Sequence, residues 1–147
     1  MQSRLLRLLS FAAPVLLCLS VPNVRAATNV PRFAYVPNFS DNTVSIYTVN
    51  ASTGQLRDNG YVLTGHGPGE VTLAGSFLYV SNFTSNDISA YSINPSTTAL
   101  EPVAGSPFGA GTNPTSLRAS VNGKFLFVSN YTSENVSAYK INPLRAQ

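Results

Sequence analysis

Cysteine is almost absent from the sequence: Cys18 is the only one among 147 residues. Cys18 lies in the first 26 residues, which are interpreted below as a leader that is removed on export. The mature chain is therefore expected to contain no disulfide, so only its packed core can hold the fold together. A metal site built from cysteine and histidine is excluded as well, and we expect no metal or other cofactor.

Charged residues are also scarce, at 10% of the chain. The formal net charge of +3 comes from Arg4, Arg7 and Arg25, which all precede residue 27. Without these arginines, the basic and acidic side chains of residues 27–147 balance. Nucleic-acid binding depends on a concentrated cationic surface. The mature chain is therefore not expected to bind nucleic acid.

The chain begins with a segment typical of secretory signal peptides. Two arginines precede an apolar stretch from Leu8 to Val21, and Ala26 ends a small-residue cleavage site. The apolar stretch is shorter than the about 20 residues that span a bilayer, and Pro14 interrupts it, so a stable membrane anchor is not expected. We assign residues 1–26 to a signal peptide and expect export to the periplasm, the cell surface or the medium.

The rest of the chain repeats one phrase three times. "FLYVSNFTSNDISAYSINP" at 77–95 returns as "FLFVSNYTSENVSAYKINP" at 125–143, and "RFAYVPNFSDNTVSIYTVN" at 32–50 is a looser copy. Equivalent asparagines in successive copies lie 44 and 48 residues apart. This spacing is close to the period of about 40 to 50 residues of propeller blades and is too long for most helical solenoids.

Each copy is predicted to form a β-hairpin, and no helix is predicted after the leader. In "FLYVSN", Phe77 and Tyr79 point to one face and Leu78 and Val80 to the other, which is typical of a strand buried on both faces. The following run is rich in β-branched and aromatic residues, and the polar segment between the runs contains turn formers. The hairpin strands are predicted at 32–38, 43–50, 77–82, 87–93, 125–130 and 135–141.

Two further strands complete each repeat. "LRDNGYVLT" (56–64) and "LEPVAGSPF" (100–108) follow the first two hairpins, and "EVTLAG" and "SLRASVNG" follow loops rich in glycine and proline. Four antiparallel strands in a meander form one blade of a propeller. The sequence therefore predicts an all-β partial β-propeller of about two and a half to three four-stranded blades. The predicted repeat units within 27–147 are 32–64, 70–108 and 116–143.

The repeated phrases resemble the YVTN-type repeats of seven-bladed lactonase-like propellers. "YVPNFSDNTVSIYTVN", "YVSNFTSNDISAYSIN" and "FVSNYTSENVSAYKIN" carry the resemblance, and "GSPF" with "NPTSLRASVNGKFLFVSN" is similar to the family's connection between blades. The family includes bacterial 6-phosphogluconolactonases, so the resemblance implies the propeller fold and allows a lactonase activity. The shared motif consists of strand and turn positions and contains none of the catalytic residues of those enzymes.

Residues 27–147 are too few for a closed propeller. At 44 to 48 residues a repeat they hold fewer than three blades, whereas a ring closes with about four to eight. No innermost strand is predicted for the first copy, and no outermost strand for the third. We expect either a truncated member of the family or a chain that self-associates through its unfinished blade edges, and we favour truncation.

Three side chains are candidate catalytic residues. His66, the only histidine, lies in a loop on the face where a propeller would bind its ligand, and it would act as a general base with Glu70 as its partner. Arg118 alternates with Leu117 on an innermost strand, where a guanidinium would hold the anionic end of a substrate. The competing interpretations are an exposed loop histidine and a solvated arginine at the channel wall.

Acidic residues also occupy the predicted hairpin turns on that face. Asp41, Asp87 and Glu134 are candidates for ligand or metal binding, although such side chains more commonly cap the backbone of a turn. We expect a small-molecule or protein ligand on this loop face.

Two functions from different classes therefore remain open. One is hydrolysis of a sugar lactone, as in 6-phosphogluconolactonases, by a chain assembled with further blades. The other is an exported module without catalytic activity that binds a ligand or a partner. We favour the binding module for this chain because a fold alone does not establish chemistry.

Overall fold

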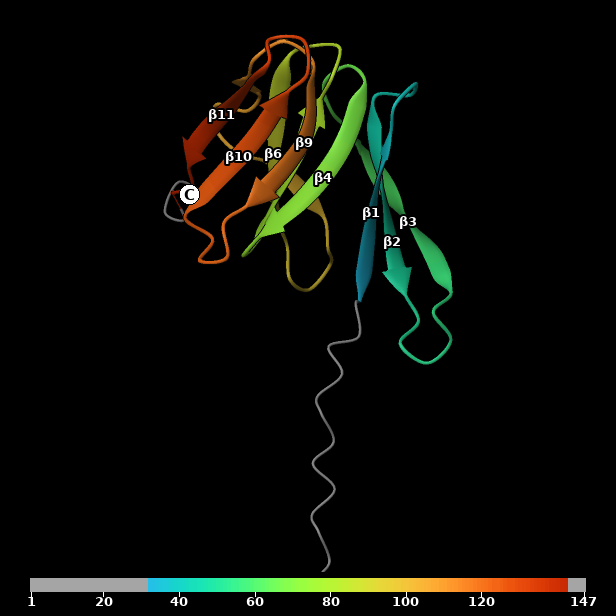
Figure 1. Cartoon of the computed structure of the whole chain (residues 1–147). Helices are drawn as coiled ribbons and strands as arrows, with labels where there is room; N and C mark the ends of the chain where they lie inside the picture. Colours follow the sequence, from blue (N-terminus) through green and yellow to red (C-terminus); the bar gives the residue numbers. More distant parts are fainter. Residues whose placement is uncertain (1–31, 143–147) are drawn as a thin grey trace, which may run out of the picture.

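The computed structural model describes residues 32–142, and all its regular structure is β. Figure 1 shows three antiparallel sheets standing side by side, with the second sheet between the first and the third. The predicted all-β partial propeller is thus confirmed. The segment assigned to the signal peptide, 1–26, lies outside the described residues. Among the residues that the structure describes, no helix is long and apolar enough to cross a membrane.

The strands follow one another as meanders. The first sheet contains β1 (Phe33–Asn38), β2 (Thr43–Val49) and β3 (Leu56–Leu63). The second contains β4 (Pro68–Ala74), β5 (Phe77–Asn82), β6 (Asp87–Ile93), β7 (Leu100–Pro102) and β8 (Phe108–Gly109). The third contains β9 (Pro114–Ala119), β10 (Phe125–Asn130) and β11 (Asn135–Lys140). All six predicted hairpin strands are confirmed to within one residue at each end.

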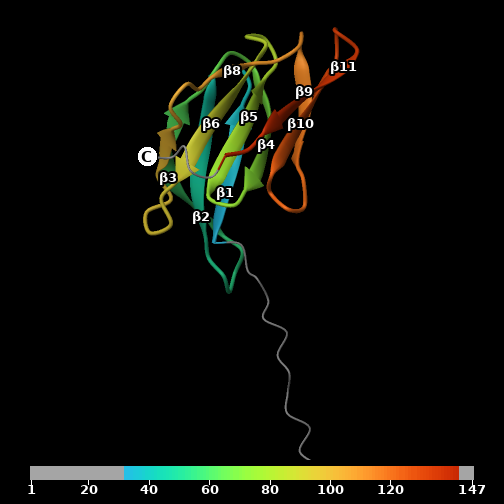
Figure 2. The same ribbon diagram turned by 90° about the vertical axis from the view of Figure 1, so that its left-hand side faces the viewer.

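In the described part of the chain, only the second sheet holds a complete blade. Its strand order is β4-β5-β6-β7, whereas the first sheet has the order β1-β2-β3 and the third β11-β10-β9. Within residues 32–142, the first sheet therefore has no strand inside β1, and the third has none outside β11. The innermost strands β4 and β9 contact each other, and Figure 2 shows β4 next to the third sheet.

The outermost strand of the second sheet is interrupted, although one continuous run was expected over 100–108. β7 pairs with β6 at Leu100 to Pro102, and β8 pairs with β6 again only at Phe108 and Gly109. Pro102 and Pro107 have no amide hydrogen for the ladder, and Gly105, at φ +84°, has a left-handed conformation. The backbone therefore bulges between β7 and β8.

The apolar core lies between the sheets, not within any one of them. Side chains from facing sheets interlock in two clusters, each almost fully removed from water. The first cluster joins the first and second sheets through Val44, Ile46, Leu78, Val80, Tyr91 and Leu100. The second joins the second and third sheets through Ala74, Ile88, Leu117, Leu126, Val128 and Ile141. Both faces of β5 are therefore buried, as predicted from its sequence.

An equivalent tyrosine hydrogen bond crosses each of the two sheet interfaces. The hydroxyl of Tyr91 donates to the carbonyl of Leu63 in the preceding sheet at 2.7 Å. One repeat later, the hydroxyl of Tyr139 donates to the carbonyl of Gly109 at 2.6 Å. The repeated tyrosine thus fixes the position of each sheet relative to the one before it.

The repeated asparagine holds each hairpin turn closed. In β5 the side-chain amide of Asn82 donates to Asp87 Oδ1 at 2.6 Å and to Ser89 Oγ at 2.8 Å. Asn38 and Asn130 make the corresponding pairs of bonds in their own hairpins. The asparagine therefore has the same structural role in all three copies.

The third copy of this asparagine has one unsatisfied atom. In the second sheet the hydroxyl of Thr64 donates to Asn82 Oδ1 at 3.1 Å. Ala110 is the repeat counterpart of Thr64. The backbone amide of Thr64 donates to the carbonyl of Asn42, and that of Ala110 donates to the carbonyl of Asn86, the equivalent residue of the next hairpin turn. Asn130 Oδ1 is buried and has no hydrogen-bond partner among the described residues.

We predict that Ala110→Thr supplies the missing donor to Asn130 and raises the free energy of unfolding by about 0.5–1.5 kcal/mol, the net value of a typical hydrogen bond. The matched control is Thr64→Ala, which leaves Asn82 Oδ1 without its donor and should cost about 1–3 kcal/mol. Urea unfolding of the three proteins measures both changes. A lower stability for Ala110→Thr than for the wild type would contradict this explanation.

Candidate functional site

The inner edge of the array is formed where β4 meets β9. Glu70 on β4 forms an ion pair with Arg118 on β9, with 2.8 Å between Oε1 and Nη1. The other carboxylate oxygen of Glu70, Oε2, accepts a hydrogen bond from the amide of Leu117 at 3.0 Å. The structure thus brings together two of the three predicted site residues, and the Glu70 carboxylate links the second sheet to the third.

Arg118 remains accessible despite this ion pair. Its side chain is 72% exposed, whereas that of Glu70 is 27% exposed. An ion pair with so much exposure contributes only about 0–1 kcal/mol to stability. Arg118 is therefore a poor candidate for a structural residue and a good one for contact with a ligand.

His66 lies in the loop between β3 and β4, with an exposed side chain. Its backbone accepts hydrogen bonds from the amides of Thr84 and Ser85, and its own amide donates to Ser85 Oγ. Thr112 has the same position one repeat later and bonds Ser133 in the same way. Within the described residues, no hydrogen bond or ion pair joins the imidazole to Glu70 or Arg118. The structure does not assemble a histidine–glutamate pair.

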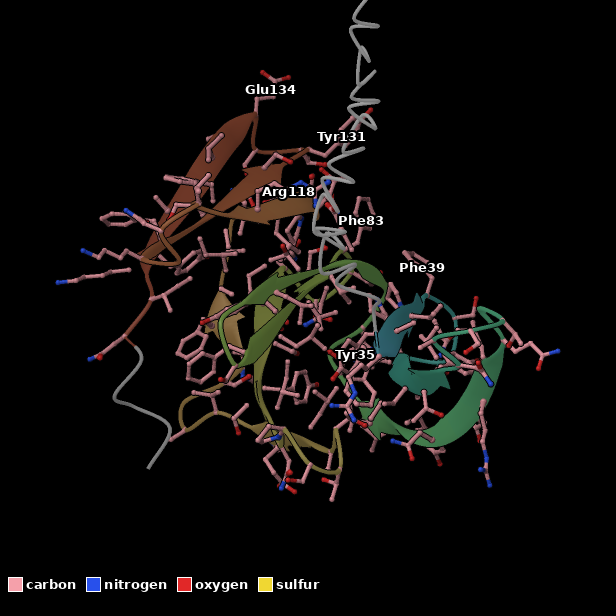
Figure 3. All side chains as sticks on the ribbon, turned by 90° about the horizontal axis from the view of Figure 1, so that it is seen from below. Tyr35, Phe39, Phe83, Arg118, Tyr131 and Glu134 are labelled. Atoms are coloured by element: carbon pink, nitrogen blue, oxygen red, sulfur yellow. The ribbon has the colours of Figure 1, made fainter. Side chains whose placement is uncertain are left out.

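An aromatic side chain follows the repeated asparagine in every hairpin turn. Phe39 and Tyr131 are 55% and 73% exposed, and Phe83 is half-buried. The rings of Phe39 and Phe83 are 6.3 Å apart between centroids and tilted by 49°. Figure 3 shows one of these aromatic side chains on each sheet, on the same side of the array as Arg118. The sequence interpretation missed these residues, although their identical position in the three phrases was a visible signal.

The acidic turn residues do not form a shared cluster. Asp87 accepts a hydrogen bond from the side-chain amide of Asn82. Glu134 has a left-handed backbone conformation at φ +51°, and Asn42 and Asn86 have this conformation at the equivalent positions of the other copies. Asp41 is exposed. In residues 32–142 there is no group of three or more histidine, cysteine or acidic side chains that could hold a metal ion.

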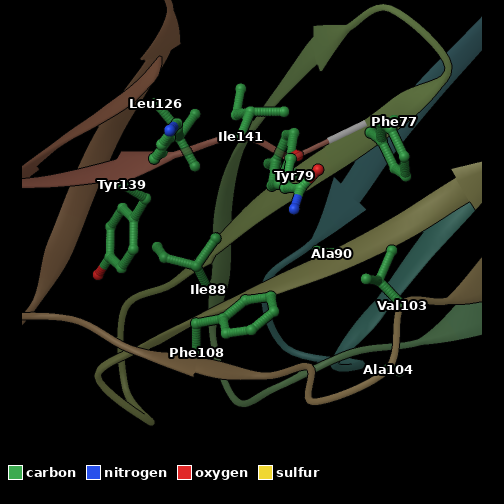
Figure 4. Close-up of a pocket in the computed structure, with 12 residues that line it drawn as sticks. Phe77, Tyr79, Ile88, Ala90, Val103, Ala104, Phe108, Leu126, Tyr139 and Ile141 are labelled. Carbon is green, nitrogen blue, oxygen red and sulfur yellow. The ribbon is translucent and has the colours of Figure 1, made fainter. Parts of the chain in front are cut away.

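An apolar cavity of about 290 Å³ lies between the second and third sheets. Figure 4 shows Phe77, Tyr79, Phe108 and Tyr139 around it. Burial raises the pKa of Tyr79. Burial also raises the pKa of Tyr139, where it is the larger of two effects on that pKa. Apart from Lys140, no charged residue lines the cavity, so its chemistry differs from that of the inner edge.

Three sheets fanned around a common inner edge, each packed against the next, define a partial β-propeller. The chain belongs to the family described as lactonase, 7-bladed beta-propeller, whose model matches residues 28–146. The resemblance seen in the repeated phrases is thereby confirmed. No curated protein matches the chain significantly.

Solved structures share this arrangement of sheets. A Bacteroides uniformis protein provisionally named a 6-phosphogluconolactonase is 23% identical, with a TM-score of 0.71 over 79% of this chain and 35% of its own. The periplasmic gluconolactonase PpgL of Pseudomonas aeruginosa is 24% identical, with a TM-score of 0.70 over 79% of this chain and 34% of its own. The chain thus spans about a third of the length of these proteins, and at these identities the likeness concerns the fold.

Proposed function

We propose that this chain is an exported binding module that recognises a sugar acid or sugar lactone at its inner edge and does not hydrolyse it. The observation that carries the proposal is the accessible guanidinium of Arg118, which Glu70 holds at the junction of β4 and β9. A guanidinium fixed in this way is suited to a carboxylate or to another cluster of oxygen atoms. The names of the similar gluconolactonases suggest the same class of ligand.

The exposed aromatic residues supply the apolar part of such a site. Phe39, Phe83 and Tyr131 lie on the same side of the array as Arg118 (Figure 3). Aromatic rings offer flat apolar surfaces at little cost in side-chain entropy, and a pyranose or lactone ring has apolar C–H groups that can lie against them. Apolar walls with a few fixed polar groups are the usual composition of small-molecule sites.

Hydrolysis is the second candidate, and the contacts of Glu70 argue against it. Both carboxylate oxygens of Glu70 are engaged, one by Arg118 and the other by the amide of Leu117. A general base must lie within hydrogen-bond reach of the water that it activates. Among the described residues, the imidazole of His66 makes no hydrogen bond or ion pair with Glu70 or Arg118. The described sheets therefore support binding better than catalysis.

Export is proposed from the leader in the sequence. We predict that cleavage after Ala26 gives a mature chain that begins at Ala27, because a basic segment and an apolar stretch precede this small residue. N-terminal sequencing of the chain recovered outside the cytoplasm checks the prediction. A soluble cytoplasmic product that keeps Met1 would contradict it.

The binding function is tested by calorimetry with gluconate, 6-phosphogluconate and glucono-1,5-lactone. Arg118→Ala is expected to weaken binding of the anionic ligands by roughly tenfold or more, equivalent to about 1.4 kcal/mol. The matched control, Arg57→Ala, removes an exposed arginine on β3 and should change nothing. Arg118→Ala should stay folded, because its exposed ion pair contributes little to stability.

Two results would contradict the binding module. One is equal affinity in Arg118→Ala and the wild type, which would place the ligand elsewhere. The other is lactone hydrolysis above the spontaneous rate that is lost in His66→Ala, which would establish the enzyme instead.

A further inference from the structure

The two outer sheets each leave one apolar face uncovered within the described residues. On β9–β11 this surface, here called the C-face, consists of Phe125, Phe127 and Val136, which are 42%, 44% and 65% exposed. On β1–β3 the surface, here called the N-face, consists of Val36, Tyr61 and Leu63, which are 40%, 67% and 74% exposed. Exposed apolar patches of this kind mark interaction surfaces.

The C-face has buried counterparts one repeat earlier. Phe77 and Ile88 correspond to Phe125 and Val136, yet they are only 8% and 1% exposed. They are covered because their face of the second sheet packs against the third sheet. The C-face is therefore the surface that each sheet presents to the sheet after it.

The N-face has buried counterparts in the other direction. Val36 corresponds to Val80 and Val128, and both of these valines are 0% exposed. Val80 packs against the first sheet and Val128 against the second. The N-face is therefore the surface that each sheet presents to the sheet before it.

We infer that two copies of this chain associate head to tail, with the C-face of each copy packed on the N-face of the other. The occupant of each face is a second copy because the chain carries both halves of this interface, and it already makes the same contact twice internally. A third contact of the same kind would bury the six side chains named above. It is a packing of sheet faces, distinct from the pairing of strand edges expected from the sequence.

Head-to-tail contacts close into a ring or extend into a filament. The described part of each copy contributes three sheets, so two copies bring six together, within the range of about four to eight blades at which propellers close. Three copies would exceed that range. The ring would place Arg118 of both copies around one channel, although the inference does not depend on any ligand.

The mass of the purified chain over a range of concentrations tests this inference, by light scattering and sedimentation. We expect a mass of two copies that does not grow further at high concentration. Phe127→Lys on the C-face and Leu63→Lys on the N-face should each weaken association by roughly tenfold or more. Val121→Lys is the matched control, since Val121 is fully exposed in the turn between β9 and β10 and lies on neither face.

Mixing the two face variants distinguishes head-to-tail pairing from a symmetric contact. Leu63→Lys keeps an intact C-face and Phe127→Lys an intact N-face, so the mixture should form more of the two-chain complex than either variant forms alone at the same concentration. A symmetric contact between two C-faces would instead let Leu63→Lys dimerise alone.

Three results would overturn the inference. A wild-type mass of one copy at every concentration would mean that another polypeptide, or nothing, covers the faces. A mass that grows without limit would show an open filament. Dimerisation of either variant alone with the affinity of the wild type would show that the two faces do not meet each other.

Discussion

The structure depends on apolar packing between neighbouring sheets. No single sheet of three or four strands can bury its own faces, and both clusters of buried apolar side chains lie where two sheets meet. The second sheet is covered on both sides and has the most buried strands, β5 and β6. The asparagine clamps and the tyrosine hydrogen bonds set the geometry of the repeat, but they are useful only because packing has already brought the sheets together.

The same packing creates the candidate site. Glu70 and Arg118 belong to different sheets, and they meet only because β4 and β9 are neighbours at the inner edge. The Glu70 carboxylate accepts a hydrogen bond from the backbone amide of Leu117 in the next sheet. The same carboxylate holds the guanidinium of Arg118, which faces solvent. The aromatic residues of the hairpin turns reach this side of the array by repetition, one from each sheet.

Local patterns in the sequence were sufficient to predict the hairpins, because alternating apolar residues and polar turns depend only on near neighbours. The interruption between β7 and β8 was missed, since Gly105 and Pro107 act against a pattern that otherwise favours a continuous strand. The pairing of Glu70 with Arg118 could not be predicted from spacing, because it depends on how two repeats pack. His66 attracted attention as the only histidine, yet its position follows from the repeat, as the equivalent Thr112 shows.

The most direct test of this account is native-state hydrogen exchange on Leu78→Ala. Leu78 is fully buried between the first and second sheets, and its truncation should cost about 2–5 kcal/mol. If packing between sheets stabilises both of them, amides in β1 and β2 should exchange faster, although none of them is hydrogen-bonded to β5. Faster exchange confined to β4, β5 and β6 would show that each sheet is stable by itself and would contradict the central claim.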